Sequence, residues 1–189
     1  LYVPCDLKTF ALHVAGGEAA FVELMNEKAK ELGMTATHYV NASGLDSPAL
    51  VTTVEDQARL LCYGLNNKTF RTLITTFSYR SMPTLLHPDG LLMNSTLRLH
   101  MDTPDFAGGM LLGGKTGYTP GAGQCLASLA EVDGVEYVLV TAHALGDNKT
   151  QSLHVRDAFS VYQYLHRLQS SGNSTVDNIS NTGERNVSE

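Results

Sequence analysis

Residues 109–117, GMLLGGKTG, contain side chains that suit two different chemistries. From Gly109 to Thr116 the segment matches G-x-x-x-x-G-K-[ST], the pattern of loops whose backbone N–H groups cradle phosphates. From Lys115 onward it is Lys-Thr-Gly, which on a strand would place an ammonium next to a hydroxyl and follow both with a residue that has no Cβ. The first pattern would bind a nucleotide, and the second would bind a carboxylate.

The segments on either side of this stretch decide between the two patterns. A phosphate loop follows a buried strand and leads directly into a helix whose first N–H groups point at the phosphates. The preceding residues, MDTPDFAG, contain a proline, and the following residues, GYTPGAGQ, contain a proline and glycines that break helices. The apolar residues 110–112 suit a strand. We therefore favour Lys-Thr-Gly on a strand, although the tripeptide alone is also common in surface turns.

Three helices are predicted in the first half of the chain. Apolar side chains recur at helical spacing over residues 18–32, and Gly33 follows as a helix-ending residue. A second helix is predicted to begin after Thr53, whose hydroxyl can accept from the N–H of Asp56, and to run to Gly64. The side chains expected to be buried on it are Ala58, Leu61 and Cys62. The other elements are a helix over residues 67–77 and a loop over residues 41–48.

The second half of the chain is predicted to be mainly antiparallel sheet. Its three apolar runs cover residues 108–117, 123–132 and 135–144. The last two runs are separated by Asp133 and Gly134, a pair typical of two-residue hairpin turns. Shorter β-compatible segments precede them at 78–86 and 90–99, and helical spacing returns over 150–168. A helix packed on an antiparallel sheet indicates the α+β class.

Composition and charge narrow the class of protein. The chain has 189 residues, of which 43% are hydrophobic, and a formal net charge of −6, so we expect a globular protein without a large cationic surface for nucleic acid. The seven histidines and the cysteines Cys5, Cys62 and Cys125 show no disulfide framework or metal-ligand spacing, and we expect no metal and no other cofactor. No apolar run approaches the roughly 20 residues of a membrane helix. The first residues do not resemble a signal peptide, and a start at Leu1 suggests a processed protein or a fragment.

Several segments resemble the low-molecular-mass penicillin-binding proteins, the serine-type D-alanyl-D-alanine carboxypeptidases of bacterial cell walls. They are FVELMNEKAKELGMTATHYVNASGLD at 21–46, TTVEDQARL at 52–60 and GGKTGYTPGAGQCLASLAEVDGVEYVLVTAHALG at 113–146. The resemblance covers most of residues 10–168 and implies a β-lactamase/transpeptidase-like fold, with residues 1–168 as a partial catalytic domain. Residues 169–189, rich in Ser, Asn, Thr and Gly, are predicted to be a disordered polar tail, because their few apolar side chains cannot offset the entropy of ordering them.

The resemblance implies a chemistry. Enzymes of this family remove the terminal D-Ala from peptidoglycan stem peptides through an acyl-enzyme on a serine, and β-lactams inhibit them by mimicking that terminus. Their motifs are Ser-x-x-Lys, Ser-x-Asn and Lys-Thr-Gly. The resemblance gives Lys115 a catalytic role, and it gives Thr116, Gly117 and Tyr118 roles in substrate binding, with the Tyr118 N–H as an oxyanion-hole donor. It also implies a place in the cell envelope, outside the cytoplasmic membrane.

Only the third of these motifs is intact. No serine in the chain is followed three residues later by a lysine, and the nearest pattern is Cys5-x-x-Lys8. By the resemblance, Val3 and Cys5 stand where the second motif has Ser and Asn, with Asp6 matching the acidic residue that follows. The Ser-Gly-Asn at 171–173 lies on the wrong side of Lys-Thr-Gly and is interpreted as a chance match. We therefore expect this chain alone to be inactive, and a non-catalytic peptidoglycan-binding or scaffold relative is the alternative.

The remaining polar candidates are given structural roles. Asp46, Glu55 and Asp56 are interpreted as loop and helix-cap groups rather than as a pair of catalytic carboxylates. Asn41 matches a loop of the family and is expected to be structural. The Asn-x-Ser/Thr sequences, such as those at Asn67, Asn94 and Asn148, are given no role, because the resemblance is to bacterial proteins.

Overall fold

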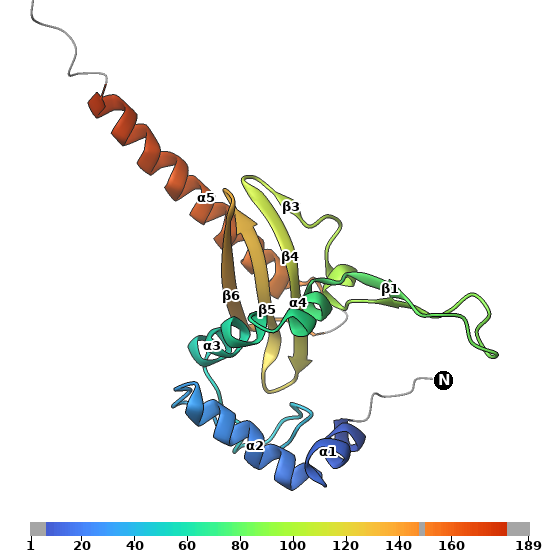
Figure 1. Cartoon of the computed structure of the whole chain (residues 1–189). Helices are drawn as coiled ribbons and strands as arrows, with labels where there is room; N and C mark the ends of the chain where they lie inside the picture. Colours follow the sequence, from blue (N-terminus) through green and yellow to red (C-terminus); the bar gives the residue numbers. More distant parts are fainter. Residues whose placement is uncertain (1–6, 148–149, 181–189) are drawn as a thin grey trace, which may run out of the picture.

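The computed structural model describes residues 7–147 and 150–180, with side chains up to Ser171. Its centre is an antiparallel sheet with one long helix on one face and helices from the first half of the chain on the other (Figure 1). The helices are α1 Leu7–Ala15, α2 Glu18–Glu31, α3 Val54–Leu65, α4 Lys68–Thr75, the 3-10 helix η1 Leu97–His100 and α5 Leu153–Ser180. The strands are β1 Ser78–Arg80, β2 Leu92–Asn94, β3 Asp105–Phe106, β4 Gly109–Thr119, β5 Gly123–Val132 and β6 Val135–Ala144.

The main sheet has the strand order β3-β4-β5-β6, and β1 and β2 form a separate hairpin that projects from the body (Figure 1). The turn between β5 and β6 is the predicted two-residue turn, because Asp133 and Gly134 have φ angles of 50° and 80°. The predicted ranges of β5 and β6 are confirmed, and β4 differs from its predicted range by one or two residues at its ends. The continuous strand β4 contains no phosphate-binding loop.

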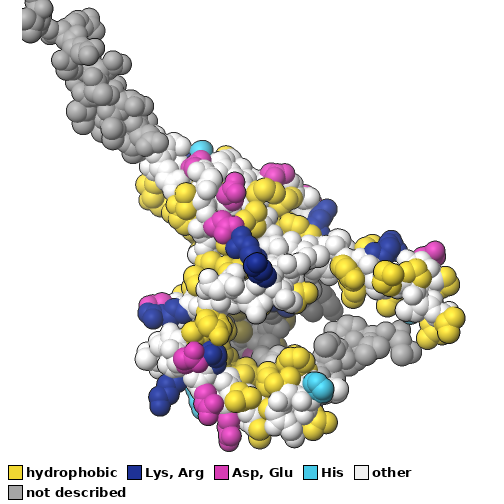
Figure 2. Space-filling model, viewed as in Figure 1, with side chains coloured by type: hydrophobic (Ala, Val, Ile, Leu, Met, Phe, Trp, Pro, Cys, Tyr) yellow, Lys and Arg dark blue, Asp and Glu magenta, His cyan; other side chains and the backbone are white. Residues whose placement is uncertain are grey.

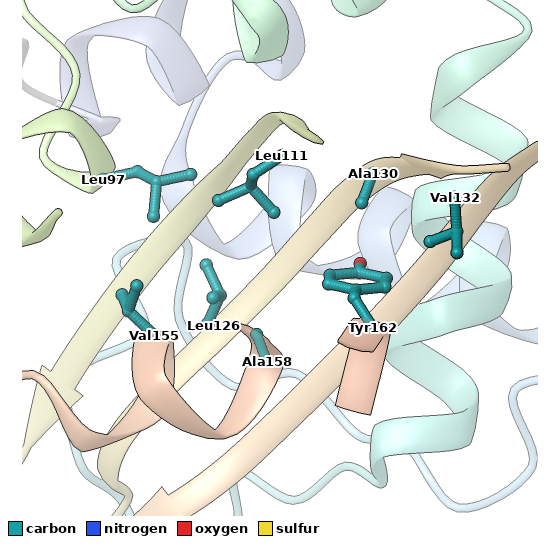
Figure 3. Packing of buried hydrophobic residues seen from close by; sticks show 8 residues of the cluster. All are labelled: Leu97, Leu111, Leu126, Ala130, Val132, Val155, Ala158 and Tyr162. Carbon is teal, nitrogen blue, oxygen red and sulfur yellow. The ribbon is translucent and has the colours of Figure 1, made fainter. Parts of the chain in front are cut away.

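The core lies between the sheet and α5. It is made by apolar side chains of β4, β5, η1 and α5, which Figure 3 shows: Leu97, Leu111, Leu126, Ala130, Val132, Val155, Ala158 and Tyr162. The helical stripe predicted from the spacing of residues 150–168 is therefore confirmed as the buried face of α5. Alternation along β5 places Leu126, Ser128 and Ala130 on this face of the sheet.

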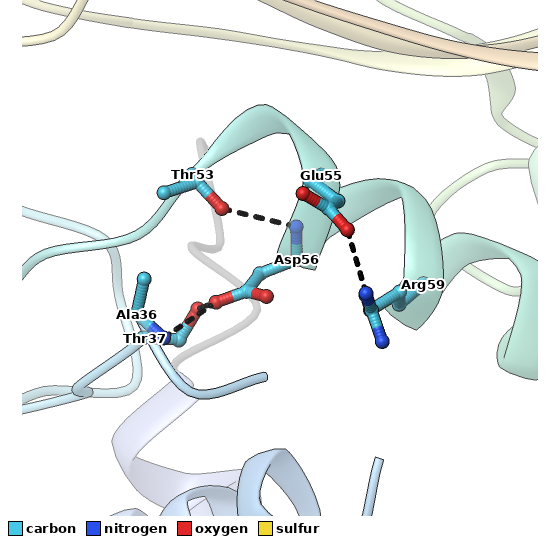
Figure 4. Close-up of polar contacts among 6 residues, drawn as sticks. All are labelled: Ala36, Thr37, Thr53, Glu55, Asp56 and Arg59. Carbon is cyan, nitrogen blue, oxygen red and sulfur yellow. Dashed lines mark hydrogen bonds and ion pairs between the residues drawn. The ribbon is translucent and has the colours of Figure 1, made fainter. Parts of the chain in front are cut away.

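The first turn of α3 is fixed by polar contacts, which Figure 4 shows. The Thr53 hydroxyl accepts from the Asp56 N–H at 3.1 Å, as predicted. The buried Asp56 carboxylate also accepts from the N–H of Ala36 at 3.0 Å and from the Thr37 hydroxyl at 2.7 Å, so it ties the preceding loop to the helix. Glu55 pairs with Arg59 at 2.6 Å on the exposed side. Thr53 is the cap, and the contacts of Glu55 and Asp56 give both carboxylates structural roles in the first turn of α3.

Several expectations about local structure are wrong. Cys62 is exposed, although we predicted burial beside the buried Leu61. Residues 97–100 form η1 rather than strand, and α1 was not predicted at all.

The polar segment after Leu168 also differs from expectation. Helix α5 continues to Ser180, so residues 169–180 are helical rather than disordered. Extending an existing helix costs much less than starting one, and this segment contains no proline. Residues 181–189 lie outside the described residues, and the domain boundary at 168 stays a prediction. Within the described part of the chain, no helix is both long and apolar enough to cross a membrane.

A buried histidine in the first turn of α5 leads to a prediction about pH. His154 is 3% exposed, and its Nδ1 lies 2.8 Å from the Gln124 side-chain oxygen. Its ring packs edge-on against that of His100, with centroids 5.3 Å apart. Burial lowers the pKa of His154 from its ordinary value of 6.5, and His100 lowers it further, against the opposing effect of Asp157.

Because this pKa is lower in the folded state, the unfolded chain binds a proton more readily than the folded chain does. Acidification through the ordinary pKa therefore favours unfolding. We expect the free energy of unfolding, measured with urea, to fall as the pH drops below the ordinary value of 6.5 towards the lower pKa of the folded state. His154→Gln is expected to show a smaller fall, whereas the exposed His87→Gln should keep the full dependence. Identical pH profiles for the wild type and His154→Gln would contradict the prediction.

Candidate functional site

The Lys-Thr-Gly tripeptide lies on β4, as predicted, and its side chains point to both faces of the sheet. Lys115 pairs with Ala127 and Gly117 pairs with Cys125, so Lys115 is on the face opposite α5. Thr116 pairs with Leu126 and is on the α5 face. The Lys115 ammonium donates to the carbonyl oxygen of Thr116.

A β-bulge determines which face Lys115 occupies. The register of β4 with β5 shifts between Leu111 and Gly113. Leu111 is buried against α5, and strict alternation would place Lys115, four residues later, on the same face. The extra residue at Leu112 reverses the alternation, as bulges do, and turns Lys115 out of the core.

Thr116 is only 8% exposed, and its hydroxyl donates to that of Thr96 at 2.7 Å. Each threonine hydroxyl can donate one hydrogen bond and accept others, so the direction of this bond can reverse. If Thr96 donates, the Thr116 hydrogen is free for a substrate carboxylate. Thr96 lies twenty residues before Thr116 and outside the three motifs of the family, so nothing in the sequence indicated this contact.

All four predicted site residues line one cleft of about 1060 Å³. Lys115, Thr116, Gly117 and Tyr118 form one wall with neighbouring residues of β5 and β6. The opposite wall is formed by the loop before α3 and the start of that helix, including Asn41, Asp46 and Gln57. A Cβ atom on Gly117 would meet nothing within 4 Å, so this residue faces open space.

The outer edge of β4 is open beside the tripeptide. β3 pairs only with Gly109 and Met110, and the N–H of Leu111 donates to Pro104. Among the residues that the structure describes, no strand pairs with this edge from Gly114 to Thr119. An open edge of this kind can take an extended peptide as a further strand.

The loop on the opposite wall is held to the sheet by one carboxylate. Asp46 accepts from the Thr119 hydroxyl at 2.5 Å and from the Gly121 N–H at 3.0 Å, which fixes the loop against the turn between β4 and β5. Within the loop, Asn41 accepts from the Gly44 N–H at 2.8 Å and donates to Leu45 at 3.0 Å. These contacts confirm that Asn41 and Asp46 are structural.

The electrostatics of the cleft centre on Lys115. The surrounding protein removes part of the water around this ammonium, and the desolvation lowers the pKa of Lys115 below its ordinary value of 10.5. A weakly hydrated cation beside an open strand edge suits a substrate carboxylate. Within residues 7–147 and 150–180, no three His, Cys, Asp or Glu side chains are placed to hold a metal ion.

The other motifs considered in the sequence do not line this cleft, or they fall on residues that the structure does not describe. Val3, Cys5 and Asp6 are outside the described residues. Lys8 is in the first turn of α1. The Ser-Gly-Asn sequence at 171–173 lies within α5, and its serine hydroxyl donates to the carbonyl oxygen of Arg167 at 2.7 Å.

The fold and the site define a class of protein, an α+β domain of the transpeptidase type. The family model described as D-alanyl-D-alanine carboxypeptidase matches residues 8–146. The chain belongs to this family, and the match confirms the resemblance seen in the sequence. The matched residues include most of those that line the cleft.

Individual relatives agree with this assignment. The chain is 33% identical over 140 residues to the D-alanyl-D-alanine endopeptidase of Escherichia coli, in an alignment that covers 73% of this chain and 43% of that protein. It is 27% identical over 178 residues to the D-alanyl-D-alanine carboxypeptidase DacD of Escherichia coli, with coverages of 87% and 41%. The chain therefore spans less than half the length of these curated relatives.

Solved structures confirm the fold. The D-alanyl-D-alanine carboxypeptidase from Mycobacterium tuberculosis superimposes with a TM-score of 0.65 and 25% identity, over 84% of this chain and 58% of that one. The Streptomyces K15 DD-transpeptidase superimposes with a TM-score of 0.56 and 22% identity, over 78% of this chain and 53% of that one. The second likeness concerns the fold alone.

Proposed function

We propose that this chain forms the carboxylate-binding half of a serine-type D-alanyl-D-alanine carboxypeptidase that acts on peptidoglycan stem peptides ending in D-Ala-D-Ala. The observation that carries the proposal is the Lys-Thr-Gly strand, with an open edge and a glycine facing empty space in the cleft. An extended peptide can pair with this edge while its terminal carboxylate reaches Lys115 and Thr116. The family membership favours this substrate over other peptides with a free carboxylate.

Each residue of the tripeptide has a separate task in this proposal. Lys115 attracts the carboxylate as a positive charge, and Thr116 donates a hydrogen bond to it once Thr96 becomes the donor to Thr116. Gly117 leaves room for the peptide backbone. The N–H of Tyr118 is one oxyanion donor, and the second is expected from the nucleophile that attacks the scissile carbonyl.

The chain by itself is proposed to bind but not to hydrolyse its substrate, because a carboxylate site without a nucleophile cannot form an acyl-enzyme. The alternative is a non-catalytic peptidoglycan-binding or scaffold relative, which the degenerate second motif at Val3 and Cys5 favours. Extending the reading frame upstream of Leu1 separates the two. A Ser-x-x-Lys there indicates an active enzyme, and a nearby start codon indicates the alternative. In either case we propose a place in the cell envelope, outside the cytoplasmic membrane.

The first test is covalent labelling. We expect a fluorescent penicillin to leave this chain unlabelled after denaturation, because no serine in it has the lysine that would activate its hydroxyl. A labelled band would contradict this expectation, and mass mapping of the peptide would show whether Cys5 had reacted.

The second test concerns the carboxylate site. Lys115→Met is expected to weaken the binding of a peptide ending in D-Ala-D-Ala, followed by NMR titration, by about 10- to 100-fold, the usual loss when a hydrogen bond to a charged group is removed. Lys30→Met, on the exposed side of α2 and outside the cleft, is the matched control and should bind like the wild type. Equal affinities for both variants would overturn the proposed role of Lys115.

A further inference from the structure

Asparagine is placed unusually in this sequence. Seven of the ten asparagines are followed, two positions later, by Ser or Thr, and none of these triplets contains a proline. Ser and Thr make up 31 of the 189 residues, so their frequency alone would produce about two such triplets. The seven are Asn41, Asn67, Asn94, Asn148, Asn173, Asn178 and Asn186. This triplet is the acceptor sequence for N-linked glycans, and the resemblance to bacterial proteins does not explain its excess.

Asn67 has a side chain suited to such a modification. It is exposed at the start of α4, and its Oδ1 accepts from the N–H groups of Thr69 at 2.9 Å and Phe70 at 3.1 Å. Its Nδ2, the atom to which a glycan is attached, has no hydrogen-bond partner among the described residues. A glycan on Nδ2 therefore leaves the helix cap intact.

Asn94 has the same arrangement. It is exposed at the end of β2, and its Oδ1 accepts from the Ser78 hydroxyl at 2.7 Å. Its Nδ2 likewise has no partner in the described part of the chain. The hairpin that carries it exposes large apolar side chains, which Figure 2 shows as yellow patches: Tyr79, Met82, Leu85, Leu86, Leu92 and Met93. A bulky hydrophilic glycan beside them would shield this surface from self-association.

Asn41 provides a contrast. Its Nδ2 donates to the carbonyl oxygen of Leu45, and its side chain lines the cleft. A glycan at this position would remove a hydrogen bond of the loop and would fill the site. The side chains of the other four asparagines lie outside the description.

We propose that Asn67 and Asn94 carry N-linked glycans. In the reaction, Nδ2 attacks C1 of the first sugar of a lipid-linked oligosaccharide pyrophosphate. The N–C1 bond forms, the C1–O bond breaks, the lipid pyrophosphate leaves with the electron pair, and the amide loses one proton. Thr69 and Thr96 complete the two acceptor sequences. Transfer takes place on the unfolded chain, so the later bond between Thr96 and Thr116 does not prevent it.

The test uses the protein purified from its natural source. Treatment with a peptide N-glycosidase in heavy-oxygen water converts each glycosylated asparagine into isotope-labelled aspartate, which peptide mass spectrometry locates. We expect labelled aspartate at positions 67 and 94, and none at Asn26 and Asn66, which are not in acceptor sequences. Unlabelled peptides at 67 and 94 would overturn the proposal. The outcome does not depend on the activity of the cleft.

Matched variants assign the glycans to single sites. Expressed in a secretory host, Thr69→Ala should lose one glycosidase-sensitive increment of mass, whereas Thr69→Ser keeps the acceptor sequence and should retain it. Thr96→Ala and Thr96→Ser should behave in the same way for Asn94. A Thr→Ala variant that keeps the full glycosidase-sensitive mass would exclude the site concerned.

Discussion

Replacing Tyr162 by alanine is expected to lower the free energy of unfolding by about 3–5 kcal/mol, as for other large aromatic side chains removed from a core. Tyr162 is 1% exposed and belongs to the cluster between α5 and the sheet, on the side of Ala130 and Val132 (Figure 3). Its ring stacks on that of Phe106 at a centroid distance of 5.7 Å. The variant would leave a cavity that the sheet cannot close, because its strands are held in register on both sides.

Tyr162→Phe separates the hydroxyl from the ring. The Tyr162 hydroxyl lies 3.0 Å from that of Ser128, and burial raises the pKa of Tyr162 to about 12, so the group stays neutral. Ser128 also donates to Leu139 at 3.2 Å and keeps a partner when the tyrosine hydroxyl is removed. We therefore expect a loss of only about 1 kcal/mol. Urea denaturation measures both variants, and equal losses would show that the ring contributes little.

Gly113→Ala is expected to destabilise the domain by about 3 kcal/mol, the upper part of the usual range for overpacking. A Cβ on Gly113 would lie 2.3 Å from the carbonyl oxygen of Ile74 and 2.7 Å from Cα of Thr75. Both are backbone atoms at the end of α4, so no side-chain rotation relieves the clash. Either α4 or β4 must move.

Gly117→Ala, four residues further along the same strand, is the matched control. Its Cβ would meet nothing within 4 Å, so we expect stability to be unchanged or to rise by about 0.5 kcal/mol, because alanine is less flexible than glycine. Under the proposed function, the same methyl group occupies the space of the bound peptide and weakens its binding. A stability loss at Gly117 equal to that at Gly113 would contradict this account of the strand.

The two glycine variants test different halves of the site. Gly113 keeps β4 in place against α4, and Gly117 keeps the cleft open in front of β4. A loss of binding in Gly117→Ala without a loss of stability would tie the cleft to the peptide. A loss of both in Gly113→Ala would show that the position of the strand is also required.

The sequence predicted correctly those strands, turns and helix ends that depend only on neighbouring residues. Apolar runs of the right length and the Asp133-Gly134 pair predicted β5, β6 and their turn, because strand length and turn geometry depend on neighbouring residues. The cap at Thr53 and the stripe on α5 were predictable for the same reason. The motif Lys-Thr-Gly and its neighbours also indicated the family.

Only the tertiary structure decided how these pieces form a site. The bulge at Leu112 places Lys115 on the cleft face, because a shift of one residue moves every later side chain of the strand to the other face. No pattern in the sequence predicted this bulge. Two hydrogen bonds of the site join residues that are distant in the sequence. One runs from Thr116 to Thr96, and the other runs from Thr119 to Asp46. Such contacts depend on the packing of whole elements, which local patterns do not contain.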